Sequence, residues 1–251
     1  PELQDLWARI DLPPQSPISQ VSIRSGTSGD PMIILHGDMN RISEVEIDFP
    51  SSIIWQDGNT WRVLAGESAI SFEIKGHIFH VSPPSYFQVN TSILVDLVEQ
   101  VMSTLQLQAG MNFFDLYAGV GLFSAFAAQQ GARVFAVEES NSACADFEVN
   151  LGKFEEISLY EASVEAALPA IDVAADIILV DPPRSGLSRA TLDAILNHLP
   201  QRLAYLSCDL GTLARDAKRL RAGGYELEHI RPIDLFPQTY HIETLSSWRR
   251  R

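Results

Sequence analysis

The sequence has few cysteines, few basic residues and no long hydrophobic run. Its 251 residues include two cysteines, Cys144 and Cys208, too few for a disulfide framework or a cysteine-rich metal site. We therefore expect a protein of the reducing cytoplasm. No apolar stretch approaches the length of a membrane span and no signal-peptide pattern opens the chain, so no membrane contact is expected. Because the first residue is Pro1, we expect a processed product or an excised fragment.

Basic residues are outnumbered, since 18 Lys and Arg stand against 32 Asp and Glu and give a net charge of −14. Such acidity argues against broad, non-specific binding of nucleic acid. The charge is uneven, because residues 86–199 carry a net −11 and residues 200–251 a net +3. The basic side chains gather within 215–221 and at 249–251. They form either a solvated helix face or an edge that contacts phosphates.

What the sequence does have is a globular composition, with 46% hydrophobic and 20% charged residues, and two kinds of periodicity. Residues 18–80 consist of short runs that alternate or stay apolar between turn signals, and they predict an antiparallel sheet of several strands. Over 91–107 the apolar residues recur at helical spacing. From residue 112 onward apolar strands alternate with amphipathic helices, which predicts an α/β fold with a parallel sheet covered on both faces.

These patterns predict a β-rich domain over 1–85 and an α/β domain over 86–251. The last two strands of the second domain are separated by a short loop only, which predicts an antiparallel pair that closes the sheet. The strands expected in the first domain lie at 18–24, 32–37, 43–49, 52–56, 60–66, 70–76 and 77–82.

A cofactor site is predicted at the first strand-to-helix turn of the α/β domain. The segment DLYAGVG ends with Gly119 and Gly121, which let the backbone approach a ligand at a helix N-terminus. Glu138 ends the next strand, where a carboxylate can accept both hydroxyl groups of a ribose. Ser124 stands where a dinucleotide-binding motif has its third glycine. The pattern therefore favours S-adenosylmethionine over a nicotinamide dinucleotide, although a tight turn needed only for packing would also explain the glycines.

Chemically active residues follow at the ends of later strands. The segment DPPRSG runs from Asp181 to Gly186 after a very apolar strand, and its two prolines make a stiff edge beside the cofactor. Cys208 ends the next strand, just before a helix whose dipole favours a thiolate. Cys144 falls inside a helix and is interpreted as packing. Glu243 opens the last strand and is expected to face the same cleft.

Six motifs, in this order, resemble the RNA uracil-5-methyltransferase family, whose members make 5-methyluridine in tRNA and 23S rRNA. The resemblance covers roughly residues 60–251, and residues 18–80 look like the β-rich central domain of those enzymes. It implies a class I S-adenosylmethionine-dependent, Rossmann-like methyltransferase sheet with an antiparallel last strand. The motifs are YFQVN, DLYAGVGLF, RVFAVE, DPPRSG, SCDLGTLARD and FPQTYHIE.

The resemblance also implies roles for individual residues. Cys208 is the matching nucleophile, which adds to carbon 6 of uracil, and Glu243 is the matching base, which removes the proton from carbon 5. S-adenosylmethionine would contact Gln88, Tyr117, Gly119, Gly121, Glu138 and Asp181. Arg184, Phe87 and Asp181 would lie at the edge of the base, the partner would be a structured rRNA or tRNA with a flipped uridine, and no metal is implied.

Three departures from the family pattern stand out. Asp209 and Leu210 follow the cysteine where the family usually has Asn-Pro, and the Asp209 carboxylate is expected to raise the pKa of the thiol. Ala162 and Ser163 occupy the third-strand position that often serves the adenine ring. Neither the N-terminal nucleic-acid-binding barrel nor the four-cysteine iron–sulfur motif of some relatives is visible. His241 has no partner at metal-ligand spacing and is interpreted as structural.

Other functions stay open at this point. An amino-group methyltransferase also uses a D-P-P loop but needs neither the cysteine nor the terminal glutamate. A 5-methylcytosine enzyme is expected to carry its nucleophile in the loop that here reads DPPR, which has no cysteine. A catalytically silent RNA-binding module fits the acidity and Asp209, and a dehydrogenase is a remote alternative. The sequence names neither the RNA nor the uridine, and it leaves the oligomeric state open.

Overall fold

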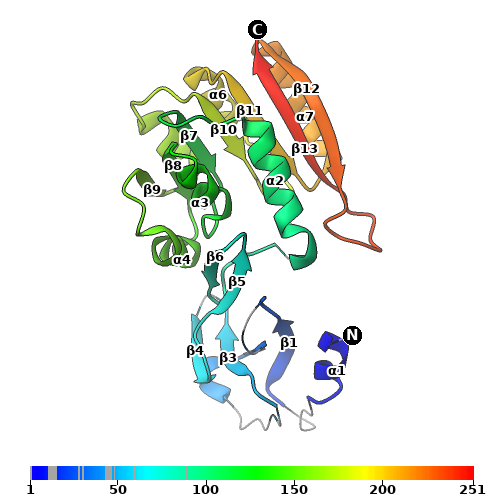
Figure 1. Cartoon of the computed structure of the whole chain (residues 1–251). Helices are drawn as coiled ribbons and strands as arrows, with labels where there is room; N and C mark the ends of the chain where they lie inside the picture. Colours follow the sequence, from blue (N-terminus) through cyan, green and yellow to red (C-terminus); the bar gives the residue numbers. More distant parts are fainter. Residues whose placement is uncertain are drawn as a thin grey trace. The chain divides into compact units, whose positions relative to one another are not determined.

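The computed structural model describes residues 2–10, 16–27, 29, 31–42, 47, 49–58, 60–88 and 90–251. Its contacts divide the chain into two compact units, residues 1–86 and 87–251. Each unit is described by itself (Figure 1). Within the described residues, no helix is both long and apolar enough to cross a membrane.

The first unit contains a four-stranded sheet with the order β1-β2-β3-β4 and a separate hairpin of β5 and β6. The expected all-antiparallel sheet is wrong in one pairing, because β2 and β3 run parallel. The 14 residues between these strands allow a crossover, which a parallel pair requires. The elements are α1 Glu2–Trp7, β1 Ile18–Arg24, β2 Met32–Gly37, η1 Met39–Arg41, β3 Ser52–Asp57, β4 Thr60–Ala65, β5 Ile70–Ile74 and β6 His77–Val81.

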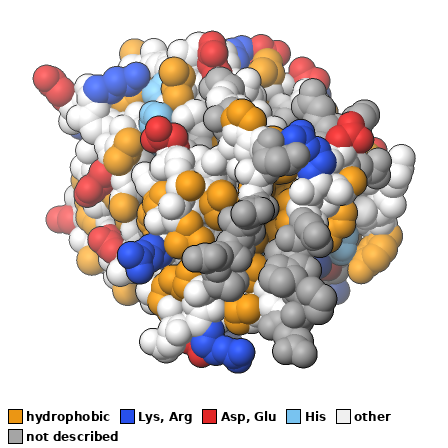
Figure 2. Space-filling model, turned by 90° about the horizontal axis from the view of Figure 1, so that it is seen from below, with side chains coloured by type: hydrophobic (Ala, Val, Ile, Leu, Met, Phe, Trp, Pro, Cys, Tyr) orange, Lys and Arg blue, Asp and Glu red, His pale blue; other side chains and the backbone are white. Residues whose placement is uncertain are grey.

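Both faces of the central strands β2 and β3 are buried. Met32, Ile34 and Ile54 are covered on one face. On the other face Ile33, Leu35 and Trp55 are fully buried together, and the indole nitrogen of Trp55 donates to the carbonyl of Gly37 at 3.1 Å. The strand expected over 43–49 falls largely outside the described residues. In Figure 2 hydrophobic side chains reach the surface between scattered charges of both signs, so the described part of that view holds no continuous basic field.

The second unit is a seven-stranded sheet with the order β12-β13-β11-β10-β7-β8-β9. Strands β7 to β11 pair in parallel, whereas β13 is antiparallel to both β11 and β12. This confirms the class I methyltransferase sheet with an antiparallel last strand, and it places β13 inside the sheet with β12 at the edge. The strands are β7 Asn112–Leu116, β8 Arg133–Glu138, β9 Ile157–Glu161, β10 Ile177–Val180, β11 Arg202–Ser207, β12 Tyr225–Ile233 and β13 Glu243–Arg250.

Helices cover both faces of this sheet, as the alternating pattern predicts. Helix α2 contacts α3, while α5, α6 and α7 form a connected group. Ser140, Ser188 and Asp209 cap three of the helices by accepting from backbone amides of the first turn. The bounds are η2 Thr91–Ile93, α2 Leu94–Leu105, α3 Leu122–Gln129, α4 Asn141–Leu151, α5 Val164–Ala167, η3 Leu168–Ala170, α6 Arg189–His198 and α7 Leu210–Ala222.

Candidate functional site

The carboxyl ends of the parallel strands bring together most of the residues that the sequence singles out. Glu138 ends β8, Asp181 follows β10 and Cys208 follows β11. Glu243 begins β13, which runs the other way, so it lies at the same edge. Open parallel sheets bind their ligands outside this edge.

The sheet register places Cys208 and Glu243 side by side. Ser207 pairs with Thr244, and Cys208 and Glu243 are the next residues outward on β11 and β13. Cys208 is half-buried. Its pKa is raised above the ordinary value by burial and by the Glu243 and Asp181 carboxyls, and Arg184 opposes this shift. The resting form is therefore the thiol, and an added positive charge would favour the thiolate.

Three carboxyl groups share this edge, those of Glu243 and Asp115, which are buried, and that of Asp181, which is half-buried. Burial raises the pKa of Glu243, which is 4% exposed, to about 7. Asp115 has its pKa raised to about 6, mainly by burial, although it accepts from the Ser124 hydroxyl at 2.7 Å. Burial, Glu243 and Asp115 together raise the pKa of Asp181 well above its ordinary value. A cationic ligand would relieve the repulsion between these groups.

Two acceptor oxygens at this edge, Gln88 Oε1 and Glu243 Oε1, are buried and have no hydrogen-bond partner within the described part of the chain. The neighbouring hydroxyl oxygen of Thr244 also lacks a partner among the described residues. The amide nitrogen of Gln88 donates weakly to Asp181 Oδ2 at 3.5 Å. Phe87 precedes Gln88 and is half-buried. Buried polar atoms are normally paired, so two such atoms at one edge mark a place where a ligand or water supplies the partner.

The turn after β7 has the backbone that its glycines predict. Tyr117, Gly119 and Gly121 have φ values of +66°, +55° and +92°. A Cβ on Gly121 would meet the side chain of Phe147 at 2.9 Å and clash with Leu151, so helix packing requires this glycine. A Cβ on Gly119 would meet nothing within 4 Å. Gly119 therefore faces open space, where a ligand can approach the backbone.

Glu138 organises the same turn. Its Oε2 accepts from the amide of Gly119 at 2.9 Å, and its Oε1 accepts from the amides of Glu139 and Ser140 at 3.0 Å and 2.8 Å. The carboxylate is thus held in one orientation by backbone donors from both sides. The hydrogen bond from the Gly119 amide to Glu138 therefore links the glycine turn after β7 to the end of β8.

A cavity of about 170 Å³ opens beside this turn and the DPPRSG loop. Ala162 and Ser163, which stand at the third-strand position in place of an acidic residue, line it. Sequence reasoning missed Glu165, which lines the same cavity and accepts from the hydroxyls of Ser188 and Thr191 at 2.6 Å each. These hydrogen bonds lower the pKa of Glu165 and keep it ionised. The further lining residues are Tyr117, Val137, Glu138, Glu139, Val164, Pro183, Ser185, Gly186 and Ser188.

A second feature that the sequence did not reveal is a clamp on the DPPRSG loop, formed by Asp216, Arg215 and Tyr205. Asp216 is fully buried and accepts from the Tyr205 hydroxyl at 2.9 Å, the Leu187 amide at 2.9 Å and Arg215 Nε at 2.8 Å. Arg215 also donates to the carbonyls of Ser185 and Leu187, each at 3.0 Å. The clamp fixes the loop to the helix that follows Cys208.

The clamp changes the interpretation of the basic cluster within 215–221. Arg215 is engaged with Asp216 and the loop carbonyls, and Arg219 pairs with Asp193 at 3.0 Å. These two side chains are therefore engaged within the protein, while Lys218 and Arg221 of the same cluster are exposed.

Two further residues near the cysteine make contacts that the sequence did not predict. The Asp209 carboxylate accepts from the Thr212 amide at 2.7 Å and so caps α7. The carboxyls that raise the pKa of Cys208 are those of Glu243 and Asp181, so the effect expected of Asp209 comes from other groups. His241, interpreted from the sequence as structural, contacts the DPPRSG loop, because its Nε2 lies 3.3 Å from an Arg184 guanidinium nitrogen.

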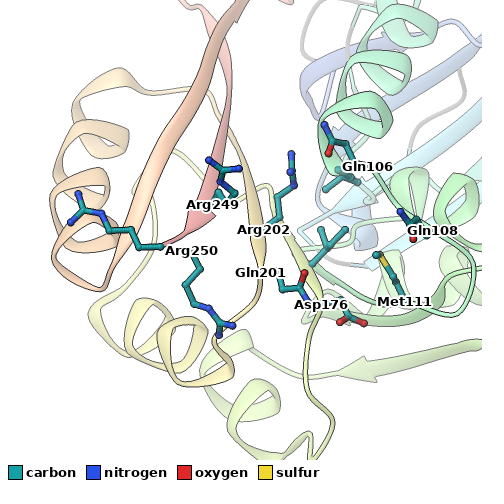
Figure 3. A pocket seen from close by; sticks show the side chains of 11 residues that line it. Gln106, Gln108, Met111, Asp176, Gln201, Arg202, Arg249 and Arg250 are labelled. Atoms are coloured by element: carbon teal, nitrogen blue, oxygen red, sulfur yellow. The ribbon is translucent and has the colours of Figure 1, made fainter.

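A larger cavity, of about 440 Å³, lies at the opposite ends of the same strands (Figure 3). Its lining includes Arg202 at the start of β11 and the basic residues 249–251. Arg202 and Arg249 both contact Glu228, at 3.2 Å and 3.1 Å. The length of β11 separates this cavity from Cys208 by roughly 20 Å, so it contains none of the predicted site residues.

Comparison with solved structures supports the fold. The tRNA (uracil-54, C5)-methyltransferase of Pyrococcus abyssi, solved with S-adenosyl-L-homocysteine, superposes with a TM-score of 0.73 at 24% identity, over 91% of this chain and 59% of that one. The tRNA m1G37 methyltransferase of M. jannaschii gives a TM-score of 0.60 at 17% identity, over 96% of this chain and 79% of that one. At these identities the likeness shows the fold alone.

Sequence comparison places the chain in a family. It is 38% identical to an uncharacterised RNA methyltransferase of Halalkalibacterium halodurans over 75% of this chain and 42% of the relative. A similar protein of Streptomyces avermitilis is 34% identical over 90% of this chain and 54% of the relative. The chain therefore spans about half the length of these relatives, or less. The model of the tRNA (uracil-5-)-methyltransferase family matches residues 67–250, and the chain belongs to that family.

Proposed function

We propose that this chain is the catalytic part of an RNA methyltransferase, and that it transfers a methyl group from S-adenosylmethionine to carbon 5 of a uridine in rRNA or tRNA. The observation that carries the proposal is the placement of Cys208 and Glu243 on adjacent strand ends beside Asp181. Family membership supports methyl transfer to RNA as the type of reaction. The side chains of Cys208 and Glu243 support a mechanism that passes through a covalent cysteine adduct.

The residues at this edge fit S-adenosylmethionine, which supplies an electrophilic methyl group on a positively charged sulfur. Gly119 faces open space and Glu138 stands at the end of β8 beside it, suited to the ribose hydroxyls. Tyr117 lines the adjoining cavity. Asp181 and the unpaired amide oxygen of Gln88 offer acceptors for the amino-acid end of the cofactor. The crowded carboxyls favour a cation in this position.

Cys208 activates the uracil ring. Carbon 5 of uracil is a poor nucleophile, and addition of the Cys208 thiolate to carbon 6 converts the ring into an enolate whose carbon 5 can take the methyl group. The new Sγ–C6 bond uses the electron pair of the thiolate, and the thiol proton passes beforehand to solvent water, which reaches the half-buried Cys208. Because the resting pKa of Cys208 is raised, we expect thiolate formation to depend on the positive charges of Arg184 and the bound cofactor.

Glu243 completes the reaction. After methyl transfer, carbon 5 carries both the methyl group and its original hydrogen. The Glu243 carboxylate removes this hydrogen as a proton, the C5–C6 double bond re-forms, the Sγ–C6 bond breaks and the Cys208 thiolate is released. A pKa of about 7 suits a group that must accept a proton near neutral pH.

The substrate must place one face of its base against Cys208, with carbon 6 over the sulfur, because a thiolate adds perpendicular to the plane of the ring. Arg184 lies near Cys208, because its carbonyl accepts from the Thr212 hydroxyl at 3.3 Å in the first turn of α7, which follows Cys208. Its guanidinium is suited to donate to a uracil carbonyl. Phe87 stands beside Gln88 at the start of the unit and offers an aromatic face. A uridine inside a helix cannot reach Cys208, so the base must be flipped or lie in a loop.

An adduct experiment tests the nucleophile. RNA that carries 5-fluorouridine cannot lose fluorine as a cation, so the methylated Sγ–C6 adduct should persist and be visible by mass spectrometry of the intact protein. Cys208→Ala should give no adduct, whereas Cys144→Ala should behave like the parent protein, because Cys144 is buried in α4. An adduct that persists in Cys208→Ala would exclude this nucleophile.

A second variant tests the base and the rival functions. Glu243→Gln should accumulate the methylated adduct on ordinary RNA, and normal turnover by this variant would exclude Glu243. Methyl transfer that survives Cys208→Ser would point to an amino-group methyltransferase. The remaining rival function is a catalytically silent RNA-binding module. Calorimetric titration tests it, because a lack of S-adenosylmethionine binding at millimolar concentration would favour that function.

A further inference from the structure

The loop between β12 and β13 carries an unusually exposed aromatic residue. Tyr240 is 89% exposed, the largest value among the exposed large hydrophobic side chains of the described residues. Its neighbours in the chain are better covered, since His241 is half-buried and Glu243 is buried. An exposed aromatic ring beside a buried reaction centre suggests a contact with a partner rather than with the fold.

The loop holds this ring in a defined position. The Thr239 amide donates to the Phe236 carbonyl at 3.2 Å, which closes a turn with Pro237 and Gln238 at its centre. Gln238 has a φ of +64°, as the third position of a type II turn requires. The Thr239 hydroxyl also accepts from the His241 amide at 3.2 Å, so the turn continues directly into the exposed ring.

The rings of this loop form one connected surface. The Tyr240 and His241 ring centroids are 4.2 Å apart, and His241 meets Phe236 edge-on at 6.1 Å. Arg184, from the DPPRSG loop, places its guanidinium 3.3 Å from His241 Nε2. We call Phe236, Tyr240, His241 and Arg184 the aromatic platform.

The platform lies beside the proposed reaction centre. Glu243 is two residues beyond His241 in the chain, and the Arg184 carbonyl accepts from the Thr212 hydroxyl at 3.3 Å in the first turn of α7, which follows Cys208. The platform therefore joins two loops that border the thiol.

We propose that the aromatic platform stacks the RNA base that adjoins the target uridine. When a base leaves its stack, its neighbour loses a stacking partner, and an exposed aromatic ring next to the flipped base can replace that partner. Arg184 adds a positive charge at the rim, where the RNA backbone between the two nucleotides must pass. This inference rests on the proposed function, and it adds a binding site for a second nucleotide.

The test measures binding and methyl transfer with synthetic RNA hairpins whose loop holds one uridine between two adenosines. In two further hairpins, the nucleotide on the 5′ or the 3′ side of the uridine is abasic. With the intact hairpin, Tyr240→Ala should raise Kd and KM about tenfold and leave kcat nearly unchanged. Tyr240→Phe should restore the parent values, because the ring alone is needed for stacking.

The abasic hairpins separate stacking from a general effect on the fold. One of them should bind Tyr240→Ala and the parent protein equally well, and this hairpin identifies the stacked side. Two results would overturn the stacking role of the aromatic platform. Tyr240→Ala could lose the same factor in affinity on all three hairpins, or it could bind the intact hairpin as tightly as the parent protein does. Methylation of the uridine by the parent protein is measured separately. The proposed function can therefore be supported even if the stacking role of the aromatic platform is refuted. Absent methylation would count against the proposed function and against the platform, which rests on it.

Discussion

Replacing Asp216 by alanine should destabilise the second unit severely. The change would leave the Tyr205 hydroxyl and the Leu187 amide without their acceptor, and both residues are nearly fully buried. Each buried unsatisfied group costs about 1–3 kcal/mol. The ion pair with Arg215 adds little, because Arg215 is half exposed. We therefore expect a total loss of about 3–5 kcal/mol in the free energy of unfolding.

A graded series makes this prediction specific. Tyr205→Phe removes one donor to Asp216, which keeps the Leu187 amide and Arg215 as partners, so the loss should be about 1–2 kcal/mol. Arg215→Gln should cost about 1–2 kcal/mol, because it removes the donors to the Ser185 and Leu187 carbonyls while solvent screens the lost charge. Asp193→Ala, which breaks an exposed pair with Arg219, is the matched control and should be nearly neutral.

Urea unfolding followed by far-ultraviolet circular dichroism is a suitable assay, because the long helices α2, α3, α4, α6 and α7 all belong to the second unit. The shift of the midpoint at constant slope gives the loss for each variant. The reasoning is refuted if Asp216→Ala costs no more than Asp193→Ala, or if Arg215→Gln costs as much as Asp216→Ala. The second result would mean that the charge of Arg215, and not the buried acceptor, holds the loop.

Further predictions follow from the same edge of the sheet. Glu243 has a folded pKa of about 7, so the native state holds its proton more tightly than the unfolded chain, and stability should fall as pH rises from about 4.5 to 7; Glu243→Gln should flatten this slope in urea titrations at several pH values. The same variant removes a carboxylate that raises the pKa of Cys208, so iodoacetamide should alkylate the thiol faster at pH 8.5. Gly121→Ala should lower the melting temperature by several degrees because its Cβ would strike Leu151; Gly119→Ala should lower it less and instead weaken binding of S-adenosylmethionine in calorimetry, since its Cβ would enter the open space.

Much of the second unit was predictable from sequence because local patterns and sheet geometry agree there. Five apolar strands with intervening helices fix a parallel sheet, and strand ends then collect Glu138, Asp181 and Cys208 at one edge. The short loop before the last strand predicted an antiparallel return, which brings Glu243 to the same edge of the sheet. The direct pairing of β13 with β11, which places Glu243 beside Cys208, was not predicted.

The missed features all depend on contacts that leave no local signal. The parallel pairing of β2 with β3 depends on the crossover between them. The hydrophobic pattern of each strand would be the same in a parallel or an antiparallel pair, so the sequence pattern does not reveal the direction. Asp216 looked like one more charge on an amphipathic helix, because the burial of its carboxylate arises from Tyr205 and the DPPRSG loop. Motif resemblance supplied the roles of Cys208 and Glu243, which composition and spacing alone did not provide.

The interior position of β13 also bears on how the sheet is assembled. After β11 and α7 the chain makes β12 first, and an ordinary crossover would set β12 directly against β11, in the place that β13 must take. The composition of β12 opposes that error, because Glu226, Glu228 and Arg231 suit a solvated edge and Pro232 lacks an amide for a second ladder. Strand β11 is thus kept open for β13, and Glu243 arrives with the last strand to pair. Partly folded chains would hold Cys208 without the proposed base beside it, so turnover would begin only once the sheet is closed.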